Sequence, residues 1–287
     1  MATHLSFLTD TQNIGEYWNE NTVLFPAQRE SVVDLPAKDD LLLALNGHFK
    51  ESKWVAGIPV NINASKVIDA QTNQQFQSID HKNCSELFNN GFTLCFGDLS
   101  DEISSVSELK KAACGIFGHP DLIFVTAYLS PPHSVGPLHY DRQHNFFLQK
   151  EGQKKWHISQ VAAIRNPFEN LVYNNVGKGF FEEMRELGYS IKSPTECGRD
   201  TLILNEGDVL YLPPGFYHSP ETLDDPSLHF TLTVEPANFW QENNKNLFSL
   251  MLRESEIFNQ DQRFLSTEEK KEIFTKCRQL IKQDCLD

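Results

Sequence analysis

Residues 123–159, IFVTAYLSPPHSVGPLHYDRQHNFFLQKEGQKKWHIS, alternate short apolar runs with turn residues. The same pattern, rich in Val, Ile, Leu, Phe and Thr, extends outward over residues 91–234. Short strands at such spacing are typical of an antiparallel barrel or sandwich. Within this part, the segments LQK-EG-QKKW and LIL-NEG-DVLYL are predicted to form hairpins.

Helical patterns surround and interrupt this β-rich part. The candidate helices are residues 10–20, 38–50, 82–90, 103–117, 178–190, 246–258 and 266–282. We therefore expect a helical and extended N-terminal region (residues 1–90) that packs on the barrel, a β core (residues 91–239), and a C-terminal helical region (residues 240–287). The last region carries too many apolar residues to remain in water, so it packs on the barrel or forms a dimer.

Composition narrows the class of protein. The 287 residues are 40% hydrophobic and 11% aromatic, enough for a real core, which excludes a disordered or fibrous chain. The net charge of −14 repels phosphate backbones, so no direct nucleic-acid binding is expected and a basic or neutral partner is favoured. The six cysteines are scattered, and the sequence shows no secretory signal, which predicts a cytoplasmic protein. No apolar run approaches the ~20 residues of a membrane span, so no membrane contact is expected.

His139 and Asp141 are separated by one residue. In an extended strand, residues i and i+2 point to the same face, so the imidazole and the carboxylate converge. His218 follows a strand that ends at residues 213–215 (PPG), and sheet closure can bring it to the same place. Two histidines and one carboxylate, with three coordination positions open, are the ligands of non-haem Fe(II) oxygenases. We therefore predict that His139, Asp141 and His218 bind Fe(II) and are catalytic.

Other histidines offer alternatives to this ligand set. His144 would complete a rival HxDxxH trio with His139 and Asp141, which could suit zinc. His133, His157 and His229 are further imidazoles. A lone histidine is more often a hydrogen-bonded structural residue than a ligand. The sequence leaves the roles of His133, His144 and His229 open.

An Fe(II) centre of this kind needs a two-electron co-substrate, commonly an oxo-acid such as 2-oxoglutarate, whose distal carboxylate must meet a buried cation. Lys154 shares one strand face with Trp156 and Ile158, while Lys155 and His157 share the other. A lysine on an inward apolar face needs an anion partner, so Lys154 is the candidate. The alternative is a surface lysine whose stem lies along apolar side chains.

Three uncharged residues are further candidates for co-substrate contact. Residues 228–235, LHFTLTVE, alternate in polarity, with Thr231 and Thr233 on the polar face, and their hydroxyls could hydrogen-bond the same carboxylate. Asn145 follows Asp141 closely and could contact the co-substrate or an oxygen on the metal. The alternative for Asn145 is a strand-end amide.

Three segments together resemble a known enzyme family. They are residues 123–159 quoted above, residues 204–221 (LNEGDVLYLPPGFYHSPE) and residues 227–240 (SLHFTLTVEPANFW). They resemble the JmjC/cupin-like 2-oxoglutarate oxygenases, and most closely the ribosomal oxygenase group. Residues 139–149 (HYDRQHNFFLQ) also resemble the asparaginyl hydroxylase that inhibits hypoxia-inducible factor. The resemblance covers about residues 90–240 and extends weakly to residues 14–26 (IGEYWNENTVLFP).

The resemblance implies a mainly β fold, a double-stranded β-helix of the jelly-roll or cupin type with flanking N-terminal and C-terminal helices. It implies that residues 91–239 are the catalytic core and that Fe(II) is held by the triad proposed above. It also implies that Lys154 binds the distal carboxylate of 2-oxoglutarate, assisted by a hydroxyl near Thr233. The family hydroxylates side chains, often at a β-carbon, with O2 consumed and succinate and CO2 released.

The sequence departs from the ribosomal oxygenases at its C-terminal end. Those enzymes continue past a helical dimerisation region into a winged-helix domain, whereas this sequence ends at Asp287 with room for the helices only. We therefore expect a relative that lacks the winged helix, which argues against a ribosomal substrate. A homodimer through the C-terminal helices remains an expectation.

Three function classes follow. The first is a hydroxylase of a protein or peptide side chain, with an extended substrate crossing a barrel mouth edged by the proline-stiffened residues 130–137. The second is a small-molecule hydroxylase, acting on an amino acid or natural product by the same mechanism. The third is a non-catalytic cupin-like binding protein, and the complete metal set with Lys154 argues against it.

Overall fold

The structure is a computed structural model that describes part of the chain. The described residues are 5, 17–45, 62–69, 72–76, 84–101, 103–167, 169–173, 179–186, 190–236, 266, 268, 271–273 and 275–276. The chain divides into two compact units, Met1–Pro236 and Ala237–Asp287. In the second unit, the described residues 271–273 and 275–276 are helical. Within the described ranges, no helix has the length and apolar character that crossing a membrane requires.

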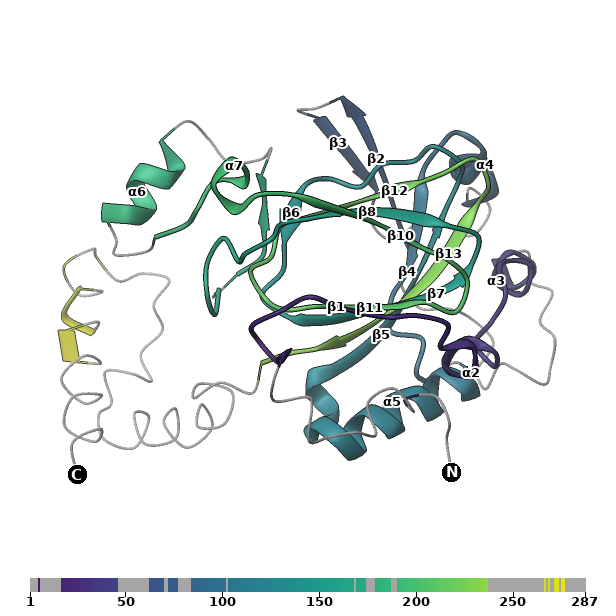
Figure 1. The fold of residues 1–287 in the computed structure, drawn as a ribbon. Coiled ribbons are helices and arrows are strands. Elements are labelled where there is room, and N and C mark those ends of the chain that lie inside the picture. The colour runs from purple at the N-terminus through teal and green to yellow at the C-terminus, as the bar shows by residue number, and fades with distance from the viewer. Residues whose placement is uncertain are drawn as a thin grey trace. The chain divides into compact units, whose positions relative to one another are not determined.

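Eight antiparallel strands form the larger sheet of the first unit, in the order β1-β11-β7-β13-β5-β4-β2-β3 (Figure 1). Their bounds are β1 Val23–Phe25, β2 Ile62–Asp69, β3 Thr72–Phe76, β4 Thr93–Phe96, β5 Ile123–Ser130, β7 His144–Glu151, β11 Val209–Leu212 and β13 Ser227–Val234. The N-terminal region therefore contributes strands to the sheet at both of its ends, through β1 on β11 and through β2 on β4.

Five antiparallel strands form the smaller sheet, in the order β10-β8-β12-β6-β9. Their bounds are β6 His139–Tyr140, β8 Lys154–Ile158, β9 Leu171–Val172, β10 Asp200–Leu204 and β12 His218–Thr222. From β5 to β8 and again from β10 to β13, successive strands alternate between the smaller and the larger sheet. This alternation is the double-stranded β-helix, so the predicted mainly β, jelly-roll fold is confirmed.

The two predicted hairpins are wrong. β7 pairs with β11 and β13, whereas β8 pairs with β10 and β12. β10 and β11 likewise lie in different sheets. The turn after β7 carries the chain across to the smaller sheet, and Gly152 adopts φ +65° there, where a Cβ would meet the carbonyl oxygen of Pro226. Alternating polarity identifies the faces of a strand but not its partner, which is why the sequence pattern suggested a hairpin.

Helices accompany the sheets. They are α2 Arg29–Val32, α3 Lys38–Leu45, α4 Cys84–Asn89, α5 Ser104–Phe117, α6 Phe180–Glu186 and α7 Pro194–Cys197, with a 3₁₀ helix at Pro120–Leu122. The predicted helices at 82–90, 103–117 and 178–190 are confirmed as α4, α5 and α6, and the first part of 38–50 as α3. Of the predicted helix at 10–20, residues 10–16 lie outside the described residues, as do all of 246–258 and most of 266–282.

The main core lies on one face of the larger sheet. Its buried side chains come from β4, β5, β7, β11 and β13 and from α5, which packs along this face (Figure 1). On β13, Leu228, Phe230, Leu232 and Val234 belong to this core. The residues between them, His229, Thr231 and Thr233, therefore face the other way, toward the space between the two sheets.

Candidate metal and co-substrate site

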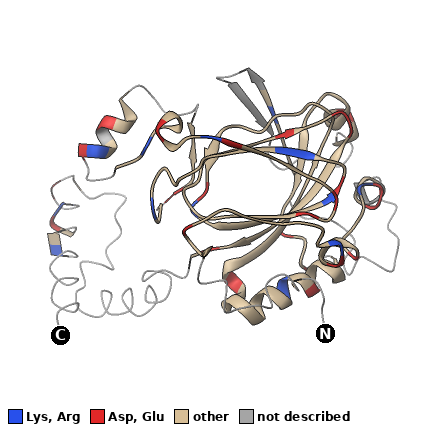
Figure 2. Ribbon diagram, in the orientation of Figure 1, with Lys and Arg blue, Asp and Glu red and all other residues tan. Residues whose placement is uncertain are grey.

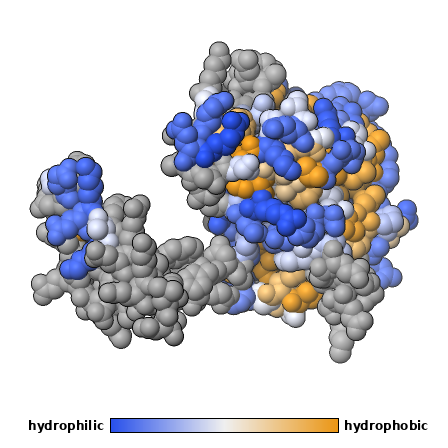
Figure 3. Space-filling view, turned by 60° about the vertical axis from the view of Figure 1, so that its left-hand side comes forward, coloured by the Kyte–Doolittle hydropathy of each residue, from blue (hydrophilic) through white to orange (hydrophobic). Residues whose placement is uncertain are grey.

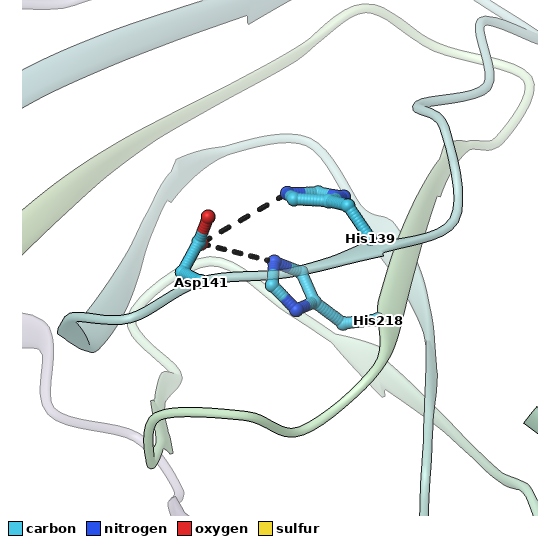
Figure 4. A group of neighbouring side chains, drawn as sticks. All are labelled: His139, Asp141 and His218. Atoms are coloured by element: carbon cyan, nitrogen blue, oxygen red, sulfur yellow. Dashed lines mark ion pairs between the residues drawn. The ribbon is translucent and has the colours of Figure 1, made fainter. Parts of the chain in front are cut away.

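Three of the predicted site residues converge where β6 meets β12. The two strands pair with His139 opposite His218, and Asp141 lies two residues beyond His139. Nε2 of His139 is 3.9 Å and Nε2 of His218 is 3.5 Å from Oδ2 of Asp141 (Figure 4). One nitrogen or oxygen atom from each residue lies within 4.8 Å of the others, so the three side chains could hold one metal ion.

Backbone carbonyl groups orient both imidazoles. Nδ1 of His139 lies 2.8 Å from the carbonyl oxygen of Pro137, and Nδ1 of His218 lies 3.1 Å from that of Phe216. A ring that donates from Nδ1 keeps the lone pair of Nε2 free, which is the usual arrangement of a metal-binding histidine. Burial, reinforced by the nearby His139, lowers the pKa of His218 to about 4. His218 is therefore neutral and able to bind metal at neutral pH.

Asn145 and Thr233 continue the site away from the metal ligands. The two residues are opposite each other on β7 and β13. Nδ2 of Asn145 donates to Oδ2 of Asp141 over 2.8 Å, and Oγ1 of Thr233 donates to Oδ1 of Asn145 over 2.9 Å. This chain of hydrogen bonds orients the Asp141 carboxylate. Both residues line the cavity, but their hydrogen bonds tie them to a candidate metal ligand rather than to Lys154.

A cavity of about 420 Å³ opens between the two sheets and contains the triad. Its walls come from β5, β7 and β13 on one side and from β6, β8 and β12 on the other. Lys154 lines this cavity although it is only 2% exposed. The alternation of buried and half-buried residues along β8 confirms that Lys154, Trp156 and Ile158 face inward. Burial lowers the pKa of Lys154 to about 7.

Two neutral neighbours hold the Lys154 ammonium. Its Nζ lies 2.9 Å from Oγ of Ser130 and 3.0 Å from Nδ1 of His229. Sequence reasoning left His229 without a role and did not single out Ser130, because a serine that precedes two prolines also fits a turn. The signal that could have identified Ser130 is its position at the inward-facing end of an apolar strand.

The cavity wall also holds buried polar atoms without partners. Among the described residues, Nε1 of Trp156 and Oγ1 of Thr231 have no hydrogen-bond partner, and both residues line the cavity. A buried unpaired donor costs about 1–3 kcal/mol, so a ligand with acceptor oxygens would stabilise this wall. Two imidazoles and a carboxylate at one place, and an ammonium with spare donors on the same cavity, fit a metal ion with a dicarboxylic oxo-acid.

Three other described histidines, His144, His157 and His133, lie away from the candidate metal ligands. His144 donates to or accepts from the hydroxyl of Tyr211 over 2.9 Å and stacks on Trp18, with ring centroids 3.8 Å apart. The rival zinc trio is therefore wrong, because the side chain of His144 is engaged elsewhere. His157 contacts Thr201 and Glu221 on the outer face of the smaller sheet, and His133 is exposed.

Comparison with known proteins agrees with this fold. Residues 112–242 match the JmjC domain family. The chain is 37% identical over 115 residues to ribosomal oxygenase 1 of Rattus norvegicus, covering 39% of this chain and 17% of that protein. It is 35% identical over 117 residues to the bifunctional lysine-specific demethylase and histidyl-hydroxylase NO66 of Aedes aegypti, covering 40% of this chain and 16% of that protein. The chain thus spans about a sixth of the length of these curated relatives.

Solved structures show the same fold. The X-ray structure of E. coli ycfD has a TM-score of 0.58 at 16% identity, covering 95% of this chain and 67% of that one. The structure of the ribosomal oxygenase YcfD with cobalt and 2-oxoglutarate has a TM-score of 0.55 at 18% identity, covering 96% and 67%. The chain has a cupin-type fold, with a His-Asp-His triad that could hold a metal ion. More particularly, residues 112–242 match the JmjC domain family, and part of the chain is similar in sequence to the ribosomal oxygenases.

Proposed function

We propose that this protein is an Fe(II)- and 2-oxoglutarate-dependent dioxygenase that hydroxylates a protein or peptide side chain. The observation that carries the proposal is the joint placement of the His139, Asp141 and His218 triad and of the buried Lys154 on one cavity. The homologues named as oxygenases and hydroxylases support it. So does the similar fold that was solved with cobalt and 2-oxoglutarate.

Each residue has a distinct role in this proposal. His139, Asp141 and His218 hold Fe(II), which with 2-oxoglutarate and O2 supplies the oxidising chemistry and releases succinate and CO2. Lys154 binds the distal carboxylate of 2-oxoglutarate by a charge-assisted hydrogen bond. Asn145, held by Thr233, keeps the Asp141 carboxylate in position and borders the co-substrate.

The rim of the cavity supports a polypeptide substrate. The segment between β5 and β6 is tied to β12, with the Gly136 amide donating to the carbonyl of Pro220 and the Thr222 amide to that of Ser134, each over 2.8 Å. Val135 lines this rim and is 45% exposed, which gives a substrate an apolar contact on an ordered edge. The net charge of −14 favours a basic or neutral peptide.

A small-molecule hydroxylase is the second candidate, because a cavity of about 420 Å³ is also the size of a metabolite site. The test supplies Fe(II), 2-oxoglutarate and O2 to the protein with a panel of basic and neutral peptides, and separately with free amino acids. We expect succinate formation and a gain of one oxygen atom in a peptide, both lost in Asp141→Ala. Turnover confined to free small molecules supports the second candidate, and no succinate under any condition contradicts both.

We also propose a three-part organisation: an N-terminal region at residues 1–90, a catalytic core at residues 91–239, and a helical region at residues 240–287 that joins two copies of the chain. Apolar residues at helical spacing in residues 246–258 support the dimer. Light scattering at micromolar concentration tests it, and a strictly monomeric mass contradicts it.

A cytoplasmic location completes the proposal. The support comes from the described cysteines Cys95, Cys114 and Cys197, whose thiols are free. Free thiols are typical of proteins kept in a reducing compartment. Fractionation of cells with an antibody against the chain tests this location.

A further inference from the structure

His229 is a buried histidine that the roles assigned above do not use. It lies on β13, is 3% exposed and lines the same cavity as Lys154. Tyr128 stacks on its ring, with centroids 5.0 Å apart and an interplanar angle of 5°. Trp156 and Phe147 approach the ring edge-on, with centroid distances of 5.6 and 6.0 Å. Aromatic contacts on several sides fix the direction in which its nitrogens point.

The contact between His229 and Lys154 has a defined polarity. When Lys154 is protonated its ammonium carries only donors, so Nδ1 of His229 then accepts from Nζ over 3.0 Å and Oγ of Ser130 accepts over 2.9 Å. A neutral ring that accepts at Nδ1 carries its proton on Nε2. Burial, followed by the charge of Lys154, lowers the pKa of His229 well below its usual value, which keeps the ring neutral.

Neutral acceptors have a particular consequence for an anion-binding lysine. A carboxylate partner would orient the ammonium but also cancel its charge, and so weaken its attraction for a ligand. Ser130 and His229 are neutral, so they orient the protonated ammonium without cancelling its charge. Among the described residues, no carboxylate forms an ion pair with Lys154. Two of the three N–H groups of Lys154 are therefore held by the protein, and the third is left for a bound anion.

We propose that His229 is a positioning residue for co-substrate binding, which aligns Lys154 with the distal carboxylate of 2-oxoglutarate by accepting one of its hydrogen bonds. This inference rests on the proposed function. Its specific content is that position 229 needs a neutral acceptor at the place of Nδ1. Asparagine can supply such an acceptor through Oδ1, whereas leucine supplies none and glutamine places its amide one carbon further from the backbone.

Calorimetry on the Mn(II)-loaded protein, which we expect to bind the co-substrate without turnover, tests this proposal. The dissociation constant of 2-oxoglutarate should rise at least about tenfold in His229→Leu, while Mn(II) affinity stays unchanged. In His229→Asn it should stay within about threefold of the unmodified protein. During turnover, His229→Leu should raise the KM for 2-oxoglutarate and leave kcat nearly unchanged, because saturating co-substrate restores the bound state.

A buried histidine outside the cavity provides the control. His144 is 4% exposed and stacks on Trp18, so His144→Leu should lower thermal stability without changing 2-oxoglutarate affinity. If His229→Leu does not fold, His229→Asn is compared with His229→Gln instead. The His229→Gln variant should bind 2-oxoglutarate more weakly than His229→Asn.

Several results would overturn the inference. One is an unchanged affinity for 2-oxoglutarate in a folded His229→Leu variant. Another is an equal loss of this affinity in His229→Leu and His229→Asn. The third is an equal loss of this affinity in the control His144→Leu. If the unmodified Mn(II) protein fails to bind 2-oxoglutarate at all, the proposed function fails and this inference fails with it. If the unmodified protein and His229→Leu both bind 2-oxoglutarate normally, the inference about His229 is wrong while the proposed function stands.

Discussion

Asp141 is the only acidic side chain among the described residues that line the cavity, and it is held by a neutral amide. Nδ2 of Asn145 donates to Oδ2 of Asp141, and Thr233 in turn holds Asn145. An amide donor lowers the freedom of the carboxylate without removing its charge. The carboxylate is thus presented to a metal ion in one orientation.

Removal of this amide should weaken metal binding. Asn145→Ala leaves Asp141 free to rotate, so we expect Mn(II) or Fe(II) affinity to fall about 10–100-fold with the fold retained. Thr233→Val acts one hydrogen bond further away and should have a smaller effect in the same direction. Metal titration with circular dichroism as the folding control measures both. Equal metal affinity in Asn145→Ala and the unmodified protein would show that the amide has another role.

The burial of Lys154 makes co-substrate binding dependent on pH. Its pKa falls from the usual 10.5 to about 7. Below pH 7, Lys154 is already protonated. Above pH 7, Lys154 must take up a proton before it can bind a dicarboxylate as an ammonium. Affinity for 2-oxoglutarate should therefore fall above pH 7, by up to about tenfold per pH unit.

Calorimetry in buffers of different ionisation enthalpy checks this prediction through proton uptake on binding. Lys154→Met should bind weakly and lose the pH dependence. It should also raise stability at neutral pH, because the unfolded chain binds this proton up to a pKa near 10.5 and the folded chain only up to about 7. The cost that the buried Lys154 imposes on folding is complete below pH 7 and disappears as the pH rises toward 10.5. Constant affinity from pH 6.5 to 9 contradicts the assignment.

Among the elements, the loop that joins β11 to β12 connects two of the candidate metal ligands. The amide of Gly215 donates to the carbonyl of Asp141 over 2.8 Å, and His218 begins β12 three residues later. Gly215 has φ +78°, and a Cβ there would meet the carbonyl oxygen of Ile164. Only glycine fits this position without displacing the loop. The loop therefore sets the distance between Asp141 and His218.

A methyl group at this position should damage both stability and metal binding. Gly215→Ala is expected to cost at least about 2 kcal/mol of unfolding free energy and to lower metal affinity. Gly115 in α5 is the matched control, because a Cβ there meets no atom within 4 Å. Gly115→Ala should stabilise the protein by up to about 1 kcal/mol without changing metal affinity. Denaturant unfolding and metal titration compare the two variants. Equal unfolding free energies and equal metal affinities in Gly215→Ala and Gly115→Ala would refute the role of the loop.

Sequence reasoning predicts strand faces better than strand partners. The i, i+2 rule placed His139 with Asp141 and Lys154 with Trp156, because these relations depend only on a local backbone period. The pairing of β7 with β13 rather than β8 depends on how the whole sheet closes, which no local pattern contains. Ser130 was missed for the same reason, since its role comes from a lysine 24 residues away on another strand.

At the scale of the molecule, the net charge bears on the proposed substrate class. The chain carries a net charge of −14. Figure 2 shows acidic and basic residues mixed along the described strands and on α5. Figure 3 shows polar and apolar residues interspersed over the face that it displays. A long-range attraction for cations is therefore expected from the total charge rather than from one acidic patch.

This attraction should make turnover of a basic peptide sensitive to salt. Between about 50 and about 500 mM salt the Debye length falls severalfold, so the KM of a basic peptide should rise and that of a neutral analogue should not. Steady-state kinetics with matched peptides in the panel described above measures the difference. An equal response of both peptides shows that net charge does not steer the substrate.

The central claim is that the triad and Lys154 bind one metal ion and one molecule of 2-oxoglutarate together. Its most direct test is an anaerobic titration of the Fe(II)-loaded full chain with 2-oxoglutarate, followed by visible absorption and calorimetry. We predict one equivalent of 2-oxoglutarate bound and a visible band that requires both Fe(II) and 2-oxoglutarate, with the band absent in Asp141→Ala and shifted to higher co-substrate concentration in Lys154→Met. Binding that does not depend on the metal, or no binding at all, would contradict the account.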